Sequence, residues 1–162
     1  MTSNVTSDLT SPLMIGSPAP HFELPDQHGT KISLASFHGK KSVVLLFIPF
    51  SFSGICTGEL CAMRDNLNAF QNEEVELLAI SCDSIFTQRA FAEKEGYKFP
   101  VLSDFWPHGE TAKAYGVFNE AKGCAIRGTF IIDKTGTLRW QVLNALGDAR
   151  HIEDYQSALA AL

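Results

Sequence analysis

The sequence predicts an α/β fold in which a central mixed β-sheet is flanked by helices. Two apolar runs of strand length, residues 43–48 and 75–81, are each followed by a segment of helical character, as expected for strands buried on both faces. Later, residues 128–132 and 138–143 flank an Asp-Lys-Thr-Gly turn at 133–136, which favours an antiparallel hairpin. Alternating strands and helices that end in a hairpin indicate a mixed sheet.

Before the first apolar run, the chain predicts a small N-terminal β-hairpin. Prolines within residues 18–25 bracket a short extended piece at 22–24. A turn at 26–29 then leads into a returning strand at 31–34, because Asp and Gly favour turns between extended segments.

Two long helices are expected in the middle of the chain. After a loop at 49–54, apolar residues at three-four-three spacing mark one buried helix face: Leu60, Met63, Leu67 and Phe70. A second helix is expected to begin with Asp83 or Ser84 as its cap, to run to about Glu95 and to stop at Gly96, because these residue types favour helix ends.

The rest of the chain supplies a short strand at 99–102, a helix at 109–115 and a terminal helix. The apolar stripe of that last helix consists of Ile152, Tyr155, Leu159 and Leu162. A strand, a loop and a helix that begins with a cysteine, followed by a late hairpin and a terminal helix, are typical of a thioredoxin-like fold.

Length and composition fit one globular domain. The chain has 162 residues, 45% of them hydrophobic and 19% charged, which suits a single core. We expect a flexible polar arm at 1–13 and one domain at 14–162. The arm carries neither the basic start nor the apolar stretch of a secretory signal, so a cytoplasmic location is expected.

Charge and hydropathy argue against two classes of partner. The formal net charge is −5 and the basic residues are scattered, whereas nucleic-acid binders concentrate them on one face. No apolar run approaches the roughly 20 residues that cross a bilayer. We therefore expect neither nucleic acid nor a membrane as a partner.

Four cysteines in a chain without an export signal do not indicate a disulfide scaffold. No Cys-xx-Cys or His-xxx-His pair is present, so we expect no metal site. His108, within Trp-Pro-His-Gly, is interpreted as a packed loop residue.

Cys56 is the main candidate for chemistry, because it lies where the first long helix begins. Unpaired backbone N–H groups and the helix dipole favour a thiolate at that position. The hydroxyl of Ser53 can cap the helix and donate to the sulfur or to a bound oxygen. Pro49 would fix the backbone and shield the sulfur from water. The alternative is that Cys56 is an inert small hydrophobe.

These residues resemble the active-site signature of the peroxiredoxins, Pro-xxx-Thr/Ser-xx-Cys, here Pro49-xxx-Ser53-xx-Cys56. Residues 127–133, Arg-Gly-Thr-Phe-Ile-Ile-Asp, resemble the strand that brings the family's catalytic arginine to the cysteine. Segments 103–109 and 114–119 resemble the AhpE-type, one-cysteine branch. The similarity extends from about Ile15 to Leu162.

The resemblance implies a thioredoxin-like fold and a thiol peroxidase that reduces hydrogen peroxide and organic hydroperoxides in antioxidant defence. Its catalytic set would be Cys56, Ser53, Arg127 and Pro49, without a cofactor. Glu59 would support an arginine, although a solvated carboxylate on the helix face is the alternative. A homodimer through the loops around the active site is also implied, with aromatic residues that can supply the patch: Phe50, Phe52, Phe105 and Trp106.

Cys61 departs from the AhpE-type pattern and resembles the second thiol of the PrxQ branch, five residues after the first. Resolution by Cys61 implies an intramolecular disulfide with Cys56, recycled by a thioredoxin, mycoredoxin or glutaredoxin-like donor. Residues five apart in a helix have Cα atoms about 8–9 Å apart, beyond the roughly 7 Å limit for a disulfide. The helix would have to unwind, which Gly54 and Gly58 would ease. Alternatively, Cys61 only packs beside Met63.

The other two cysteines lie outside the matched motifs. Cys82 ends a core strand and is interpreted as filling space, and Cys124, in a loop before Arg127, is a weaker candidate resolving thiol. Two other functions stay open. A thioredoxin-like dithiol oxidoreductase normally carries Cys-xx-Cys, whereas residue 59 is Glu. A peroxide sensor or holdase would use the same reactive thiolate as a switch.

Overall fold

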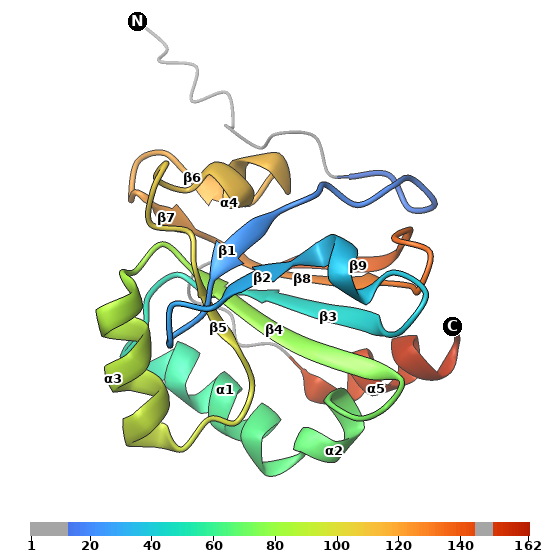
Figure 1. The fold of residues 1–162 in the computed structure, drawn as a ribbon, viewed down its shortest axis with the longest axis horizontal. Helices are drawn as coiled ribbons and strands as arrows, with labels where there is room; N and C mark the ends of the chain where they lie inside the picture. The colour runs from blue at the N-terminus through green and yellow to red at the C-terminus, as the bar shows by residue number, and fades with distance from the viewer. Residues whose placement is uncertain (1–12, 145–150) are drawn as a thin grey trace, which may run out of the picture.

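The computed structural model describes residues 13–144 and 151–162. Two facing layers of helices and loops enclose the sheet (Figure 1). The strands are β1 (Glu23–Pro25), β2 (Lys31–Ser33), β3 (Ser42–Phe47), β4 (Val75–Ser81), β5 (Val101–Ser103), β6 (Phe118–Asn119), β7 (Cys124–Ala125), β8 (Arg127–Ile132) and β9 (Leu138–Asn144). The helices are η1 (Leu34–Phe37, a 3-10 turn), α1 (Gly54–Asp65), α2 (Leu67–Phe70), α3 (Ile85–Glu95), α4 (Glu110–Ala114) and α5 (Ile152–Ala160).

The central sheet has five strands in the order β5-β4-β3-β8-β9. β3 pairs in parallel with β4 and antiparallel with β8, with Leu46 opposite Thr129. β5 continues the parallel side and β9 the antiparallel side. The mixed sheet and the late hairpin predicted from the sequence are therefore confirmed.

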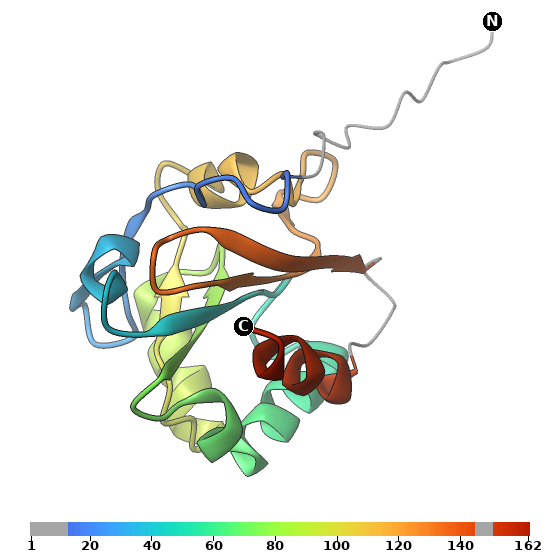
Figure 2. The same cartoon turned by 90° about the vertical axis from the view of Figure 1, so that its right-hand side faces the viewer.

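Each face of the sheet has its own apolar core. One cluster, which includes Phe47, Tyr115 and Phe130, packs under the N-terminal hairpin and α4. The other joins Leu46, Leu60 and Phe91 with Tyr155, and lies under α1, α2, α3 and α5. Figure 2 shows α5 and α1 on one side of the sheet and α4 on the other. The central strands are apolar throughout because both faces are covered.

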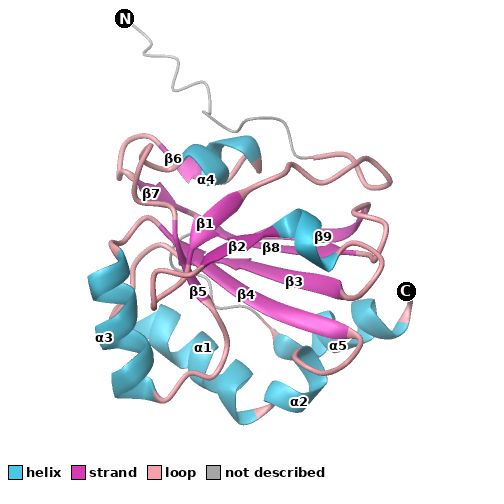
Figure 3. Cartoon of the chain, viewed as in Figure 1, coloured by secondary structure: helices cyan, strands magenta, loops and turns pink. Residues whose placement is uncertain are grey.

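Most predicted elements form close to their expected bounds, as the distribution of helices and strands shows (Figure 3). The N-terminal hairpin pairs Leu24 with Ile32. Ser84 caps α3 by accepting a hydrogen bond from the Thr87 N–H, and Gly96 ends it in the left-handed conformation, which glycine adopts without strain. The predicted arm at 1–13 lies almost wholly outside the described residues, and the single-domain boundary stays a prediction.

The long helix predicted over Leu60 to Phe70 is interrupted at Asn66, which has φ −117° and ψ 27°. The Asn66 side-chain amide donates to the Ala62 carbonyl at 2.9 Å, and asparagine often competes with the helical backbone in this way. Both pieces nevertheless bury their apolar residues in the same core, so the predicted buried face is confirmed across the break.

Two smaller expectations need correction. Leu162 lies beyond the end of α5 and is 51% exposed, so the apolar stripe of that helix ends before it. Cys124 is not in a loop: it pairs with Asn119 in the two-stranded β6–β7 ladder. The strands of this ladder have two residues each, too short to show an alternating apolar pattern. Among the described residues, no helix is long and apolar enough to cross a membrane.

Candidate active site

The candidate active site lies at the edge of the sheet where β3 ends and α1 begins. Pro49 is buried just after β3, and Ser53 is the N-cap residue of α1. Cys56 lies in the first turn of that helix, as the sequence predicted, and its side chain is outside the described part of the structure. The N-terminal position favours a thiolate because the N–H groups of the first turn lack helical partners.

Ser53 does not cap the helix with its side chain, contrary to expectation. Its hydroxyl oxygen is buried and has no hydrogen-bond partner among the residues that the structure describes. A buried hydroxyl without a partner is disfavoured and calls for an explanation. The Ser53 hydroxyl is therefore available to a group that enters the site.

Arg127 reaches the site from a distant part of the chain. It is the first residue of β8 and is 2% exposed. Because β8 runs antiparallel to β3 with Leu46 opposite Thr129, the register places Arg127 level with Ile48, next to Pro49. A strand that returns alongside β3 thus brings a permanent positive charge to the loop before Cys56.

The Arg127 guanidinium donates a hydrogen bond from Nη1 to Oε1 of Glu59. Both side chains are almost fully buried, 3% and 6% exposed. Glu59 lies three residues after Cys56 on α1. The alternative of a solvated carboxylate is therefore wrong, and the predicted support of an arginine by Glu59 is confirmed. The charge of Glu59 gave no sign of its burial, because its partner lies 68 residues away.

Cys61 lies on the part of α1 that faces α3. Its Sγ is 3.5 Å from Oε2 of Glu95 and 3.7 Å from the Tyr97 hydroxyl. Arg64 donates from Nη1 to the Glu95 carbonyl at 2.5 Å. These contacts tie the middle of α1 to the end of α3. Cys61 therefore has polar partners, and it also packs against the apolar core that contains Met63, so both roles considered for it stay open.

Cys82 and Cys124 are both buried. Burial raises the pKa of the Cys82 thiol to about 12, and the negative charge of Asp104 acts in the same direction. A thiol held protonated is a poor nucleophile, which agrees with the interpretation of Cys82 as a residue that fills space.

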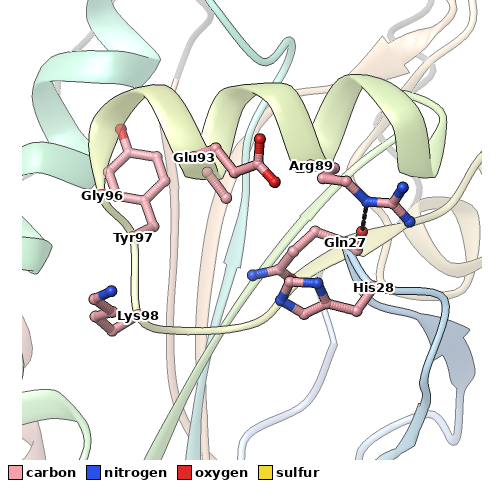
Figure 4. A pocket seen from close by; sticks show the side chains of 8 residues that line it. Gln27, His28, Arg89, Glu93, Gly96, Tyr97 and Lys98 are labelled. Atoms are coloured by element: carbon pink, nitrogen blue, oxygen red, sulfur yellow. Dashed lines mark hydrogen bonds between the residues drawn. The ribbon is translucent and has the colours of Figure 1, made fainter.

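Other polar features lie away from this loop. A cavity of about 440 Å³ lies between α3 and the N-terminal hairpin, lined by Gln27, His28, Arg89 and Lys98 among others. Figure 4 shows Arg89 donating to the Gln27 carbonyl across it. None of the predicted catalytic residues lines this cavity. His108 contacts Phe105 and Phe118 with its ring, in agreement with a packed loop residue.

Comparisons with known proteins agree with this geometry. Residues 15–141 match the model of the AhpC/TSA family. The chain belongs to this family of peroxiredoxins. It is 45% identical over 150 residues to alkyl hydroperoxide reductase E of Mycobacterium tuberculosis, covering 93% of this chain and 98% of that protein. It is also 36% identical to a thioredoxin peroxidase of Trypanosoma brucei rhodesiense, covering 86% of this chain and 74% of that one.

Solved structures of related peroxiredoxins have the same fold. The reduced 2-Cys peroxiredoxin of Plasmodium vivax superposes with a TM-score of 0.82 at 29% identity, covering 93% of this chain and 82% of that one. Peroxidoxin BcpB of Mycobacterium tuberculosis gives 0.81 at 30% identity, covering 91% and 97%. The thioredoxin-like fold is therefore confirmed, and this peroxiredoxin is a thiol peroxidase, an oxidoreductase.

Proposed function

We propose that this peroxiredoxin reduces hydrogen peroxide and organic hydroperoxides through the Cys56 thiolate. The observation that carries the proposal is the buried Arg127–Glu59 pair, which brings a guanidinium to the first turns of the helix on which Cys56 lies. The sulfur would attack one peroxide oxygen in line with the O–O bond. An S–O bond forms, the O–O bond breaks, and sulfur is oxidised to sulfenic acid. The peroxide proton stays on the sulfenic acid, and the other oxygen leaves as water or alcohol after it takes up from solvent the proton that the thiol lost on ionising.

The neighbouring residues have distinct roles in this proposal. Arg127 holds the peroxide and stabilises the charge that develops on the leaving oxygen. Glu59 orients the Arg127 guanidinium and keeps its charge paired. The buried hydroxyl of Ser53 supplies a hydrogen bond to the peroxide, which would explain why a buried hydroxyl at this position has no partner among the described residues. Pro49 fixes the start of the loop and limits the access of water.

Replacement of the sulfur tests the assignment of Cys56. We expect Cys56→Ser to abolish hydroperoxide consumption, because a serine hydroxyl does not ionise near neutral pH. Cys61→Ser is the matched control, and it should still consume one equivalent of peroxide. Consumption by Cys56→Ser at the wild-type rate would overturn the proposal.

We further propose that Cys61 resolves the sulfenic acid. The Cys61 thiol would attack Cys56, forming the S–S bond and releasing water. Since residues five apart in an intact helix are too distant for a disulfide, the first turns of α1 must unwind. A thioredoxin, mycoredoxin or glutaredoxin-like dithiol would then reduce the bridge.

Mapping the thiols by mass spectrometry after one equivalent of peroxide tests this cycle. A Cys56–Cys61 bridge is the expected product. A sulfenic acid that persists at Cys56 would assign the protein to the one-cysteine class and leave its peroxidase activity intact.

The proposed setting is antioxidant defence in the cytoplasm as a homodimer. Support for the dimer comes from exposed aromatic side chains on the loops after β3 and β5. Large exposed apolar groups are typical of association surfaces, and the two loops leave the same edge of the sheet because β3, β4 and β5 are parallel. We define the aromatic patch as Phe50 (46% exposed), Phe52 (46%), Phe105 (52%) and Trp106 (82%).

A further inference from the structure

Gln88 is a fully buried polar residue of α3 whose amide joins three segments of the chain. Its Oε1 accepts a hydrogen bond from the Ser51 hydroxyl at 2.5 Å. Its Nε2 donates to the Ser81 hydroxyl at 2.6 Å and to the Leu102 carbonyl at 3.0 Å. The Gln88 amide therefore links the loop before α1 to β4 and β5.

Asp83 holds the same loop at a second point. Its Oδ2 accepts from the Ser51 backbone N–H at 2.8 Å and from the Ser81 hydroxyl at 2.6 Å. The Asp83 carbonyl in turn accepts from the Ser103 hydroxyl at 2.6 Å. Ser51 is thus fixed through its main chain by Asp83, in the turn between β4 and α3, and through its side chain by Gln88 of α3.

The residue after Ser51 explains why such fixing is needed. Phe52 has φ +70°, a left-handed conformation that is unfavourable for a bulky aromatic residue. Its ring packs on Phe91 with 4.9 Å between centroids. Ser53, the N-cap of α1, follows immediately. The conformation of residues 51–53 therefore sets the position of the Ser53 hydroxyl and of the first turn of α1.

We propose that Gln88 is a positioning residue for peroxide reduction, which acts through Ser51 to hold the strained loop that presents Ser53 and the first turn of α1. The inference rests on the proposed role of Cys56. Gln88 takes part in no bond-making step. Its effect is to keep the loop in the reactive geometry, and small displacements of reacting groups are costly to rate.

The test compares Gln88→Leu with Gln27→Leu. Gln27 is also a buried glutamine that joins segments: its Nε2 donates to the Phe99 carbonyl at 3.2 Å and its Oε1 accepts from the Val101 N–H at 2.9 Å. It lies beside the cavity of Figure 4, away from the loop at 49–53. Both variants lose buried amide hydrogen bonds, so a general loss of stability lowers both thermal midpoints.

The rate of Cys56 oxidation by hydrogen peroxide, measured by stopped flow, distinguishes a positioning role of Gln88 from a general loss of stability. We expect Gln88→Leu to lower the second-order rate constant by about 10- to 100-fold and to shift the pH profile of the rate. Gln27→Leu should stay within about two-fold of wild type, because the hydrogen bonds that Gln27 loses go to Phe99 and Val101, whereas Gln88 bonds to Ser51 of the loop. Equal rates in the two variants would overturn the inference.

Ser51→Ala provides a milder variant that keeps the bonds of Gln88 to β4 and β5, and it carries the test if Gln88→Leu does not fold. We expect the double variant, with both Ser51→Ala and Gln88→Leu, to be about as slow as Gln88→Leu alone. The two changes remove the same hydrogen bond, and the effects of substitutions at contacting residues are not additive. A wild-type rate for Ser51→Ala would also overturn the inference. Cys56→Ser in the same assay tests the proposed function separately.

Discussion

At the scale of single residues, the Ser53 hydroxyl is a group that does not stabilise the fold but has a place in the proposed reaction. It is buried, makes no capping bond and has no partner. Such a group contributes nothing to stability and is costly to keep. Its presence is accounted for if it binds a peroxide oxygen during the reaction.

Ser53→Ala should therefore lower activity without lowering stability. We expect kcat/KM for hydrogen peroxide to fall by about 100-fold, the usual effect of removing one donor to developing charge. The free energy of unfolding should stay within about 0.5 kcal/mol of wild type or rise, because no hydrogen bond is lost. Steady-state kinetics and urea denaturation measure the two quantities. A large loss of stability would indicate a capping role instead.

Arg127 gives a second prediction at this scale. Arg127→Lys keeps the charge but loses the planar fork that Glu59 holds. We expect the rate of Cys56 oxidation to fall by about 10-fold or more. Arg139→Lys is the matched control, since Arg139 pairs with Asp133 on the surface and is 51% exposed. A rate for Arg127→Lys equal to that of the control would contradict the proposed role of Arg127.

At the scale of elements, the proposed cycle requires α1 to be stable enough to present Cys56 and weak enough to unwind when Cys61 attacks. The contacts of Cys61 with Glu95 and Tyr97 hold its middle against the end of α3. Tyr97 is buried, and its ring stacks on Phe99 with 5.0 Å between centroids. Its hydroxyl can therefore be removed while the ring keeps its packing.

Tyr97→Phe should accelerate formation of the Cys56–Cys61 disulfide. We expect the step after sulfenic acid formation to be about 2- to 10-fold faster, which corresponds to one lost hydrogen bond of about 0.5–1.5 kcal/mol. Oxidation of Cys56 itself should be unchanged. Tyr115→Phe is the control, because the Tyr115 hydroxyl donates to the Pro20 carbonyl on the other face of the sheet. Rapid-quench mass spectrometry distinguishes the two steps, and equal disulfide rates in both variants would exclude this role of Tyr97.

The β8–β9 turn contributes a pH dependence to stability. Burial alone would raise the pKa of Asp133, but hydrogen bonds from Thr135, Arg139 and Thr137 lower it to about 2. An unfolded aspartate has a pKa of about 3.9. Because the pKa of Asp133 is lower in the folded than in the unfolded chain, its carboxylate stabilises the folded state above about pH 4, and this stabilisation is lost as the pH falls toward 2. Asp133→Asn should flatten the dependence of the melting temperature on pH in that window, and an unchanged slope would contradict this explanation.

At the scale of the whole molecule, the aromatic patch predicts association. Trp106→Glu should shift the dimer toward monomer, because a buried charge would replace an apolar contact. Met14→Glu is the control, because Met14 is also exposed, at 77%, but lies elsewhere on the molecule. Gly16, two residues after Met14, donates to the Leu138 carbonyl, and Leu138 lies at the end of the β8–β9 pair opposite to Arg127. Sedimentation velocity measures the outcome. A wild-type protein that is monomeric at high concentration would rule out the dimer.

The whole molecule also shows which features follow from local sequence pattern and which depend on contacts between distant segments. The strands and helices could be predicted because apolar periodicity is local, and the glycine after α3 marks its end unambiguously. The burial of Glu59 could not be predicted from local pattern, because it depends on β8 pairing with β3, and only the family resemblance implied its arginine partner. Gln88 was missed for the same reason: a lone glutamine on a helix gives no signal until the loop and two strands surround it.

The placement of β8 beside β3 has a consequence for synthesis. Glu59 and Arg127 are 68 residues apart, and proteins are made from the N-terminus onward. A nascent polypeptide that has emerged only as far as α4 carries Cys56 without its guanidinium. If Arg127 activates Cys56 as proposed, we expect the growing chain to carry an ordinary thiol, which becomes sensitive to oxidants only after the returning strand β8 has been translated and has docked.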